Sequence, residues 1–217
     1  GQLAIHGTGA VDVATVEGHD VGWIGRSAYV PMENLPRIST AVEADVKFRS
    51  AVLSGGGSDS GYMAGLCLES RPGDRINFFL IENVFGPVVQ IAVDEGDEFN
   101  VGGPHFPIVR GQTYRLRLEL EMESKLVRGF VDGAVVLERT FRGDAGVSRA
   151  GVMAAVRTAG DVLDARFDNL SVSHVLDCAG IPNECQDDAY SIEPLAPYCV
   201  AVRLATIRGT RGGEIAL

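Results

Sequence analysis

A strict alternation of apolar and polar side chains between residues 113 and 141 limits the folds open to this chain more than any other feature. The apolar positions are Tyr114, Leu116, Leu118, Leu120 and Met122, and the positions between them are Arg115, Arg117, Glu119, Glu121 and Glu123. Successive side chains of a β-strand point to opposite faces of its sheet. The period of two therefore predicts a strand with one buried face and one solvated face.

The same period recurs along the chain, with turn residues between the segments. In "AVEADVKFRS", residues 41–50, one face carries Val42, Ala44, Val46 and Phe48, and the other carries Glu43, Asp45, Lys47 and Arg49. Asp132-Gly133 lies between two apolar runs, which is the signal of a two-residue hairpin with a type I′ turn. The chain has 27 glycines and no long helical period of apolar residues. These features predict an all-β sandwich of antiparallel strands.

The 217 residues suit one fairly large domain with an appendage. We expect the sandwich to occupy residues 1–174. Residues 175–217 form a C-terminal extension that is rich in Pro, Cys and acidic residues near its start and has room for one or two strands around "VAVRLATI".

The cysteines indicate an oxidising compartment. Cys178, Cys185 and Cys199 cluster late in the chain, whereas Cys67 lies in an apolar strand pattern and is expected to be a buried thiol. A bridge between Cys178 and Cys185 is our first expectation, although four cysteines permit three full pairings and the connectivity stays open. A disulfide favours a secreted or cell-surface protein.

The formal net charge of −10 argues against nucleic acid as a partner, because phosphates would be repelled. It also disfavours anionic membranes, and no apolar run is long enough to span a bilayer. The ordinary explanation of this charge is solubility.

Several of these segments together carry a family resemblance. They are "VEADVKFRS", "YRLRLEL" leading into "GFVDGAVVLERT", and "ARFDNLSVS". The stretch from Ala41 to Ser173 resembles a concanavalin A-like, laminin G-like β-sandwich, and is closest in style to the bacterial domains grouped with the 3-keto-disaccharide hydrolase family. The resemblance implies two curved antiparallel sheets in a jelly roll. Families of this architecture bind or cut glycans, or serve as adhesive and structural modules, so fold alone does not fix function.

The resemblance also implies calcium (Ca2+) as a structural ion. In related sandwiches an Asp on the final strand joins backbone carbonyls near the chain start to hold calcium, and Asp168 matches that position; the alternative is an ordinary strand-entry Asp. Asp94 and Asp97, in the acidic loop "VDEGDEFNVGG", are a second candidate set, whose alternative is a solvated turn. The segment "DCAGIPNECQDD", 177–188, resembles a short dockerin-like calcium repeat, with Ala179 and Gly180 where ligands are expected.

Paired carboxylates for glycoside cleavage are not found. Glucanases of this architecture carry Glu-x-Asp-x-x-Glu, but Phe48 stands where the second Glu is required after Glu43. Glu119 and Glu121 share a strand face about 7 Å apart, a spacing compatible with an inverting pair. Arg115 and Arg117 lie on that face too and would hold both carboxylates ionised. We expect the polar row to face water, and we assign no catalytic residue. The four histidines lack a zinc spacing and are expected at the surface or in loops.

Four aromatic residues near presumed loops are candidates for stacking on a sugar: Trp23, Tyr29, Tyr62 and Phe106. Trp23 fits the core equally well. The expected function is a secreted, non-catalytic, lectin-like module for glycan binding or adhesion. The alternative is a self-assembling extracellular structural subunit of filament or surface-layer type, whose terminal strands "GQLAIHG" and "VAVRLATI" pair with other copies. A sugar hydrolase ranks third. The expected partners are therefore a glycan or copies of the protein itself.

Overall fold

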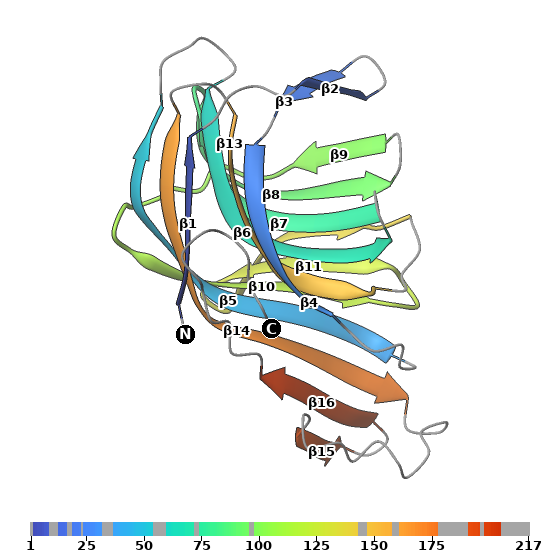
Figure 1. Ribbon diagram of the computed structural model, residues 1–217. Helices are drawn as coiled ribbons and strands as arrows, with labels where there is room; N and C mark the ends of the chain where they lie inside the picture. Colours follow the sequence, from blue (N-terminus) through green and yellow to red (C-terminus); the bar gives the residue numbers. More distant parts are fainter. Residues whose placement is uncertain are drawn as a thin grey trace.

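The protein folds into two antiparallel β-sheets packed face to face, a jelly-roll β-sandwich, as the alternation predicted (Figure 1). The computed structural model describes residues 2–8, 13–16, 19–22, 24–31, 37–53, 60–71, 74–95, 98–142, 147–157, 161–177, 191–195 and 198–204. Within these ranges no helix occurs that has the length and apolar character to cross a bilayer.

The larger sheet has eight strands. Its order is β12 (Ala134–Thr140), β11 (Leu126–Val131), β10 (Thr113–Glu121), β5 (Arg37–Val52), β14 (Val162–Asp177), β16 (Tyr198–Leu204) and β15 (Ser191–Leu195), with β1 (Gln2–Thr8) also paired to β14. Figure 1 shows the long strands β5 and β14 side by side, with β16 and β15 beyond them.

The second sheet has six strands, and a small hairpin stands apart from both sheets. The six-stranded order is β4 (Ile24–Pro31), β13 (Arg149–Val156), β6 (Gly61–Arg71), β7 (Asp74–Asn83), β8 (Gly86–Glu95) and β9 (Glu98–Gly102). The hairpin pairs β2 (Val13–Val16) with β3 (His19–Gly22). In both sheets strands distant in sequence are neighbours, since β13 lies between β4 and β6 and β5 between β10 and β14.

The main hydrophobic core fills the space between the two sheets. The apolar face expected for 41–50 and for 113–122 supplies much of it: Val42, Ala44, Val46 and Phe48 of β5 and Leu116, Leu118 and Leu120 of β10 are all 0% exposed. From the opposite sheet Tyr62 meets Phe48 with ring centroids 5.8 Å apart. In β5 and β10, therefore, the apolar residues are buried in the core and the polar residues between them point to the outer face.

The Asp132-Gly133 turn forms as predicted. Val131 pairs directly with Ala134, and φ is positive at both central residues, 50° at Asp132 and 83° at Gly133. These are the φ signs that a type I′ turn requires. The Asp132 carboxylate also accepts a hydrogen bond of 2.8 Å from the backbone N–H of Arg115, which ties the turn to β10.

The last described strands belong to the same sheet as the sandwich. Strand β14 continues to Asp177, past the boundary expected at residue 174, and β16 pairs with its final seven residues. Strand β1 pairs with the first part of β14, from Gln2↔Asp168 to Thr8↔Val162. Cys67 is a buried thiol, as expected. Cys178 and Cys185 lie outside the described residues, and their bridge stays a prediction.

Candidate functional site

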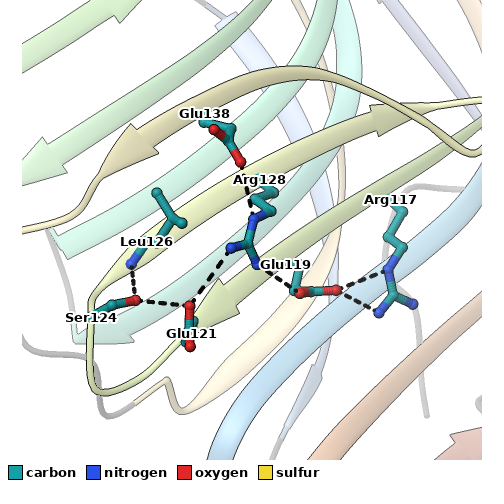
Figure 2. A network of polar contacts seen from close by, with 7 residues as sticks. All are labelled: Arg117, Glu119, Glu121, Ser124, Leu126, Arg128 and Glu138. Carbon is teal, nitrogen blue, oxygen red and sulfur yellow. Dashed lines mark hydrogen bonds and ion pairs between the residues drawn. The ribbon is translucent and has the colours of Figure 1, made fainter.

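The polar row that alternates with the core residues of β10 forms a lattice of ion pairs on the outer face of the eight-stranded sheet. Figure 2 shows Arg128 between Glu119, Glu121 and Glu138, and Arg117 on the far side of Glu119. Arg117 Nη2 lies 2.7 Å from Glu119 Oε2, and Arg128 Nε lies 3.0 Å from Glu138 Oε1. Glu119 and Glu121 are therefore both engaged in ion pairs with arginines on this face.

The lattice continues on β5 through Arg115. Its guanidinium contacts the carboxylate of Glu43 and lies 3.1 Å from Asp45 Oδ1. Burial lowers the pKa of Arg115, but the hydrogen bonds and negative charges of Glu43 and Asp45 outweigh that effect and raise the pKa above its ordinary value. The charges on this face are therefore mutually compensating.

Asp168 lies opposite Gln2 of β1, and calcium at this position stays a prediction. Asp168 Oδ1 accepts the backbone N–H of Asn169 at 2.9 Å, and the Asn169 side-chain amide donates to Asp45 Oδ2 at 2.6 Å. The Arg115 guanidinium donates to the Asn169 carbonyl at 3.3 Å. Throughout the described residues no group of three or more His, Cys, Asp or Glu side chains is placed to hold a metal.

The other calcium candidates are left open by the structure. Asp94 lies on β8, in register with Arg75 of β7, but the structure does not describe its side chain. Asp97 lies outside the described residues. Calcium at these positions stays a prediction.

Two of the aromatic candidates, Tyr62 and Phe106, pack against other residues of the protein. Tyr62 is 0% exposed, so its ring cannot stack on a sugar; it was expected near a loop, and it begins the buried face of β6. Burial, and then a hydrogen bond to Glu82, raises the pKa of Tyr62. Phe106 is half-buried and packs edge to face on Tyr114, with ring centroids 5.9 Å apart.

Two of the four aromatic candidates are not placed in detail. Trp23 lies outside the described residues. Tyr29 belongs to β4 and pairs in register with Gly151 of the neighbouring strand β13, but its side chain is not described. Stacking by either residue stays a prediction.

The outer face of the six-stranded sheet is unlike that of its partner, because it is largely buried and partly apolar. Its apolar members form a second hydrophobic cluster of Met63, Phe79, Ile81, Ala92 and Ala155, which are 1–7% exposed, with Val88 and Met153 packed against them. Each of these residues alternates along its strand with residues of the main core. This face was not anticipated from the sequence.

A buried carboxylate marks the polar end of this face. Glu69 of β6 is 3% exposed and forms an ion pair with Arg149, its register partner on β13. Ser148 supports the arrangement, since its backbone N–H and its hydroxyl both donate to the Glu69 carbonyl, at 2.8 and 3.2 Å. A carboxylate this deeply buried needs such a partner, because desolvation would otherwise be very costly.

Two carboxamides lie between the buried carboxylate and the apolar cluster. Asn77 of β7 pairs with Ala92, and Phe79 pairs with Gln90 of β8, so Asn77 and Gln90 are diagonal neighbours, about 7–8 Å apart. Gln90 is 8% exposed and Asn77 is half-buried, yet neither side chain makes a hydrogen bond or ion pair to the part of the chain that the structure describes. Neither amide is among the buried side-chain atoms of the described residues that lack a partner, so both amides reach solvent.

The sequence held a signal for these two residues. Gln90 is the single polar residue inside "PVVQIAV" and Asn77 the single amide inside "RINFFLIE". A polar side chain in an otherwise apolar strand is worth attention because β-strands of this composition are buried on both faces.

Comparison with known proteins supports the architecture. No protein-family model matches the chain, and no curated protein matches it. Among solved structures the chain is similar to a functionally unknown protein from Saccharomyces cerevisiae, with a TM-score of 0.52 and 11% sequence identity over 79% of this chain and 87% of that one. This likeness shows a common fold and nothing about a ligand.

Two further solved structures carry carbohydrate-binding names. One is the metal-free form of the Emp46p carbohydrate recognition domain, with a TM-score of 0.49 and 13% identity over 78% of this chain and 87% of that one. The other is the carbohydrate-binding module CBM66 from Bacillus subtilis, with a TM-score of 0.45 and 15% identity over 77% of this chain and 94% of that one. The narrower likenesses to 3-keto-disaccharide hydrolase domains and to dockerin repeats stay predictions.

Proposed function

We propose that this protein is a non-catalytic glycan-binding module that holds its ligand on the outer face of the six-stranded sheet, around Asn77 and Gln90. One observation carries the proposal. The Gln90 carboxamide lies on a largely apolar face, makes no hydrogen bond within the described chain, and is not among the buried polar atoms that lack both a partner and contact with solvent.

Sugar hydroxyls are well matched to such amides. A hydroxyl both donates and accepts a hydrogen bond, and each carboxamide offers an oxygen acceptor and two N–H donors. The half-buried Val88, two residues from Gln90, and the half-buried Met153 supply apolar surface on the same face, as the C–H faces of a sugar ring require. The proposal rests on these contacts and not on likeness of fold.

A binding role fits the charges of this face better than a hydrolytic one. Glu69 is the buried carboxylate among the described residues of the face, and it forms an ion pair with Arg149. Hydrolysis of a glycosidic bond needs a protonated acid together with a second carboxylate. We propose an extracellular location for the module on the basis of the late cysteine cluster.

The test replaces Gln90 by leucine, which has nearly the same shape. A glycan array identifies a ligand for the wild-type protein, and calorimetry then measures its Kd. We expect Gln90→Leu to weaken binding about tenfold or more, the loss of one or two hydrogen bonds to the ligand. Gln112→Leu, at an exposed position of the 103–112 loop, is the matched control and should leave the Kd unchanged.

A stability measurement separates binding from structure. If Gln90 serves a ligand, Gln90→Leu should keep or raise the urea midpoint, because the substitution removes no hydrogen bond to the described part of the chain. A lowered midpoint would mean that Gln90 is structural. An array without hits on folded protein, or wild-type affinity in Gln90→Leu, would remove the proposal.

A further inference from the structure

We infer that the glycan is an extended oligosaccharide that lies along β8, from Gln90 to the exposed Phe85 at the tip of the β7–β8 hairpin; this rests on the function proposed above. Gln90 and Val88 are two residues apart on the outer face of β8, and the same row continues to Gly86 at the start of the strand. From Gln90 to Gly86 the row is about 13 Å long. A single sugar ring is too short to cover that length, whereas a chain of several sugars can.

The segment that follows β9 adds a polar ring to this row. His105 forms an isolated antiparallel bridge with Val88, so the two side chains lie on the same outer face. The side chain of His105 is exposed, and its Nε2 lies 3.7 Å from the point that a Cβ at Gly86 would occupy. Because Gly86 has no side chain, the imidazole is not covered by the strand. It is therefore placed to exchange hydrogen bonds with a sugar hydroxyl.

The tip of the hairpin presents an aromatic ring at the end of the row. Phe85 is 82% exposed and its neighbour Val84 is 45% exposed, so Phe85 is the most exposed large apolar side chain among the described residues. The turn that carries it is held from the outer face. Asn83, which follows Ile81 in the outer row of β7, accepts a hydrogen bond of 2.8 Å from the backbone N–H of Phe85, and Gly86 supplies the positive φ, 103°, that closes the turn.

The groups along this row match a sugar chain in kind and in order. A carboxamide, an isopropyl group, an imidazole and a phenyl ring follow one another from Gln90 to Phe85. A sugar chain likewise offers hydroxyls and C–H faces along its length, and aromatic side chains with a few polar groups are the usual lining of a ligand site. The fold buries little of the Phe85 ring, so most of its apolar surface remains for a ligand.

The experiment measures Kd by calorimetry for a size series, from the disaccharide to the hexasaccharide, of the oligosaccharide that gives the strongest signal on the glycan array. We expect the Kd of the wild-type protein to fall about tenfold or more along the series. Phe85→Ala should weaken binding of the hexasaccharide about threefold to tenfold, the effect of one stacked ring, and leave the Kd of the disaccharide unchanged. Gln90→Leu should weaken binding of both. Val135→Ala, at a 51% exposed position of β12 on the opposite sheet, is the matched control and should change neither.

A second variant tests the row independently of the tip. His105→Ala should also weaken binding of the hexasaccharide, and both variants should keep the wild-type urea midpoint, because both side chains are exposed. The same Kd for the disaccharide and the hexasaccharide, or wild-type binding of the hexasaccharide by Phe85→Ala and His105→Ala, would overturn the inference and leave the proposed function standing. Binding of no glycan on the array to folded protein would instead remove the proposed function.

Discussion

His174 is buried on the same face of β14 as the apolar residues Leu170 and Val172. It is 3% exposed, and its Nδ1 is 3.1 Å from the hydroxyl of Thr40, its register partner on β5. The expectation of a surface or loop position for this histidine was wrong. Leu170, Val172 and His174 are two residues apart, so the period that predicted the strand also placed His174 on the buried face.

The burial of His174 makes the stability of the protein sensitive to acid. Burial, and then the positive charge of Arg37, lowers the pKa of His174 to about 4, against 6.5 in the unfolded chain. The folded state holds the neutral ring, so this contribution to the free energy of unfolding is complete above pH 6.5 and is lost as the pH falls toward 4. The expected loss is about 3 kcal/mol at pH 4.

Urea unfolding at several pH values measures this loss against a His174→Gln variant. The carboxylates of the chain contribute equally to both proteins, so the difference between their pH profiles isolates the histidine. Profiles that stay parallel from pH 7 to pH 4 would contradict the assignment.

At the scale of elements, the β11–β12 hairpin depends on its turn residues. Gly133 has φ of 83°, and a side chain added there would meet nothing within 4 Å, so any cost of substitution comes from the backbone alone. We expect Gly133→Ala to lower the free energy of unfolding by about 1–2 kcal/mol, the cost of the left-handed conformation for a residue with a Cβ. Gly133→Asn should cost less, since Asn tolerates that region. Urea midpoints of the two variants provide the check, and equal midpoints would show that the turn is not strained.

The two faces of β10 should differ strongly in what they contribute to stability. Leu118 is 0% exposed, and Leu118→Ala should cost about 2–5 kcal/mol in the free energy of unfolding, through lost burial and a cavity. The adjacent Arg117 has a side chain that is 35% exposed, and Arg117→Met should cost less than about 1 kcal/mol, because ion pairs in contact with solvent are screened. Chemical denaturation of the two variants compares them directly. A loss at Arg117 as large as that at Leu118 would show that the charge lattice is a main source of stability.

At the scale of the whole molecule, the strands near the two ends of the chain extend the eight-stranded sheet by pairing with β14 of the same chain. Strands β1 and β16 both pair with β14 of their own chain, one along each part of it. The alternative function, assembly through these strands, would require them to leave β14 or to use other edges. Monomers alone in light scattering, in buffer containing calcium and with both termini intact, would remove that alternative.

Removal of β15 and β16 should expose an unpaired strand edge that can associate with other chains. A chain that ends at residue 190 leaves the backbone of β14 from Ser171 to Asp177 without the partners that β16 provides. Unpaired strand edges recruit other chains, so we expect concentration-dependent association and a lower urea midpoint than in the full chain. Size-exclusion chromatography with light scattering measures the first effect. A truncated chain that stays monomeric with an unchanged midpoint would show that the two strands contribute little.

The sequence by itself determined the strands, their buried faces, the hairpin turn and the absence of the glucanase carboxylate pair. These features depend on pleating and on φ, and both act between residues close together in the chain. Only the tertiary structure placed Glu69, Asn77 and Gln90 on one face, because their proximity depends on the register of β6, β7 and β8. The partner of Glu69 is more distant still, since Arg149 lies on β13, 80 residues further along the chain. Burial on the outer face of a sheet is likewise a long-range property, which explains why the site residues were missed while the fold was predicted.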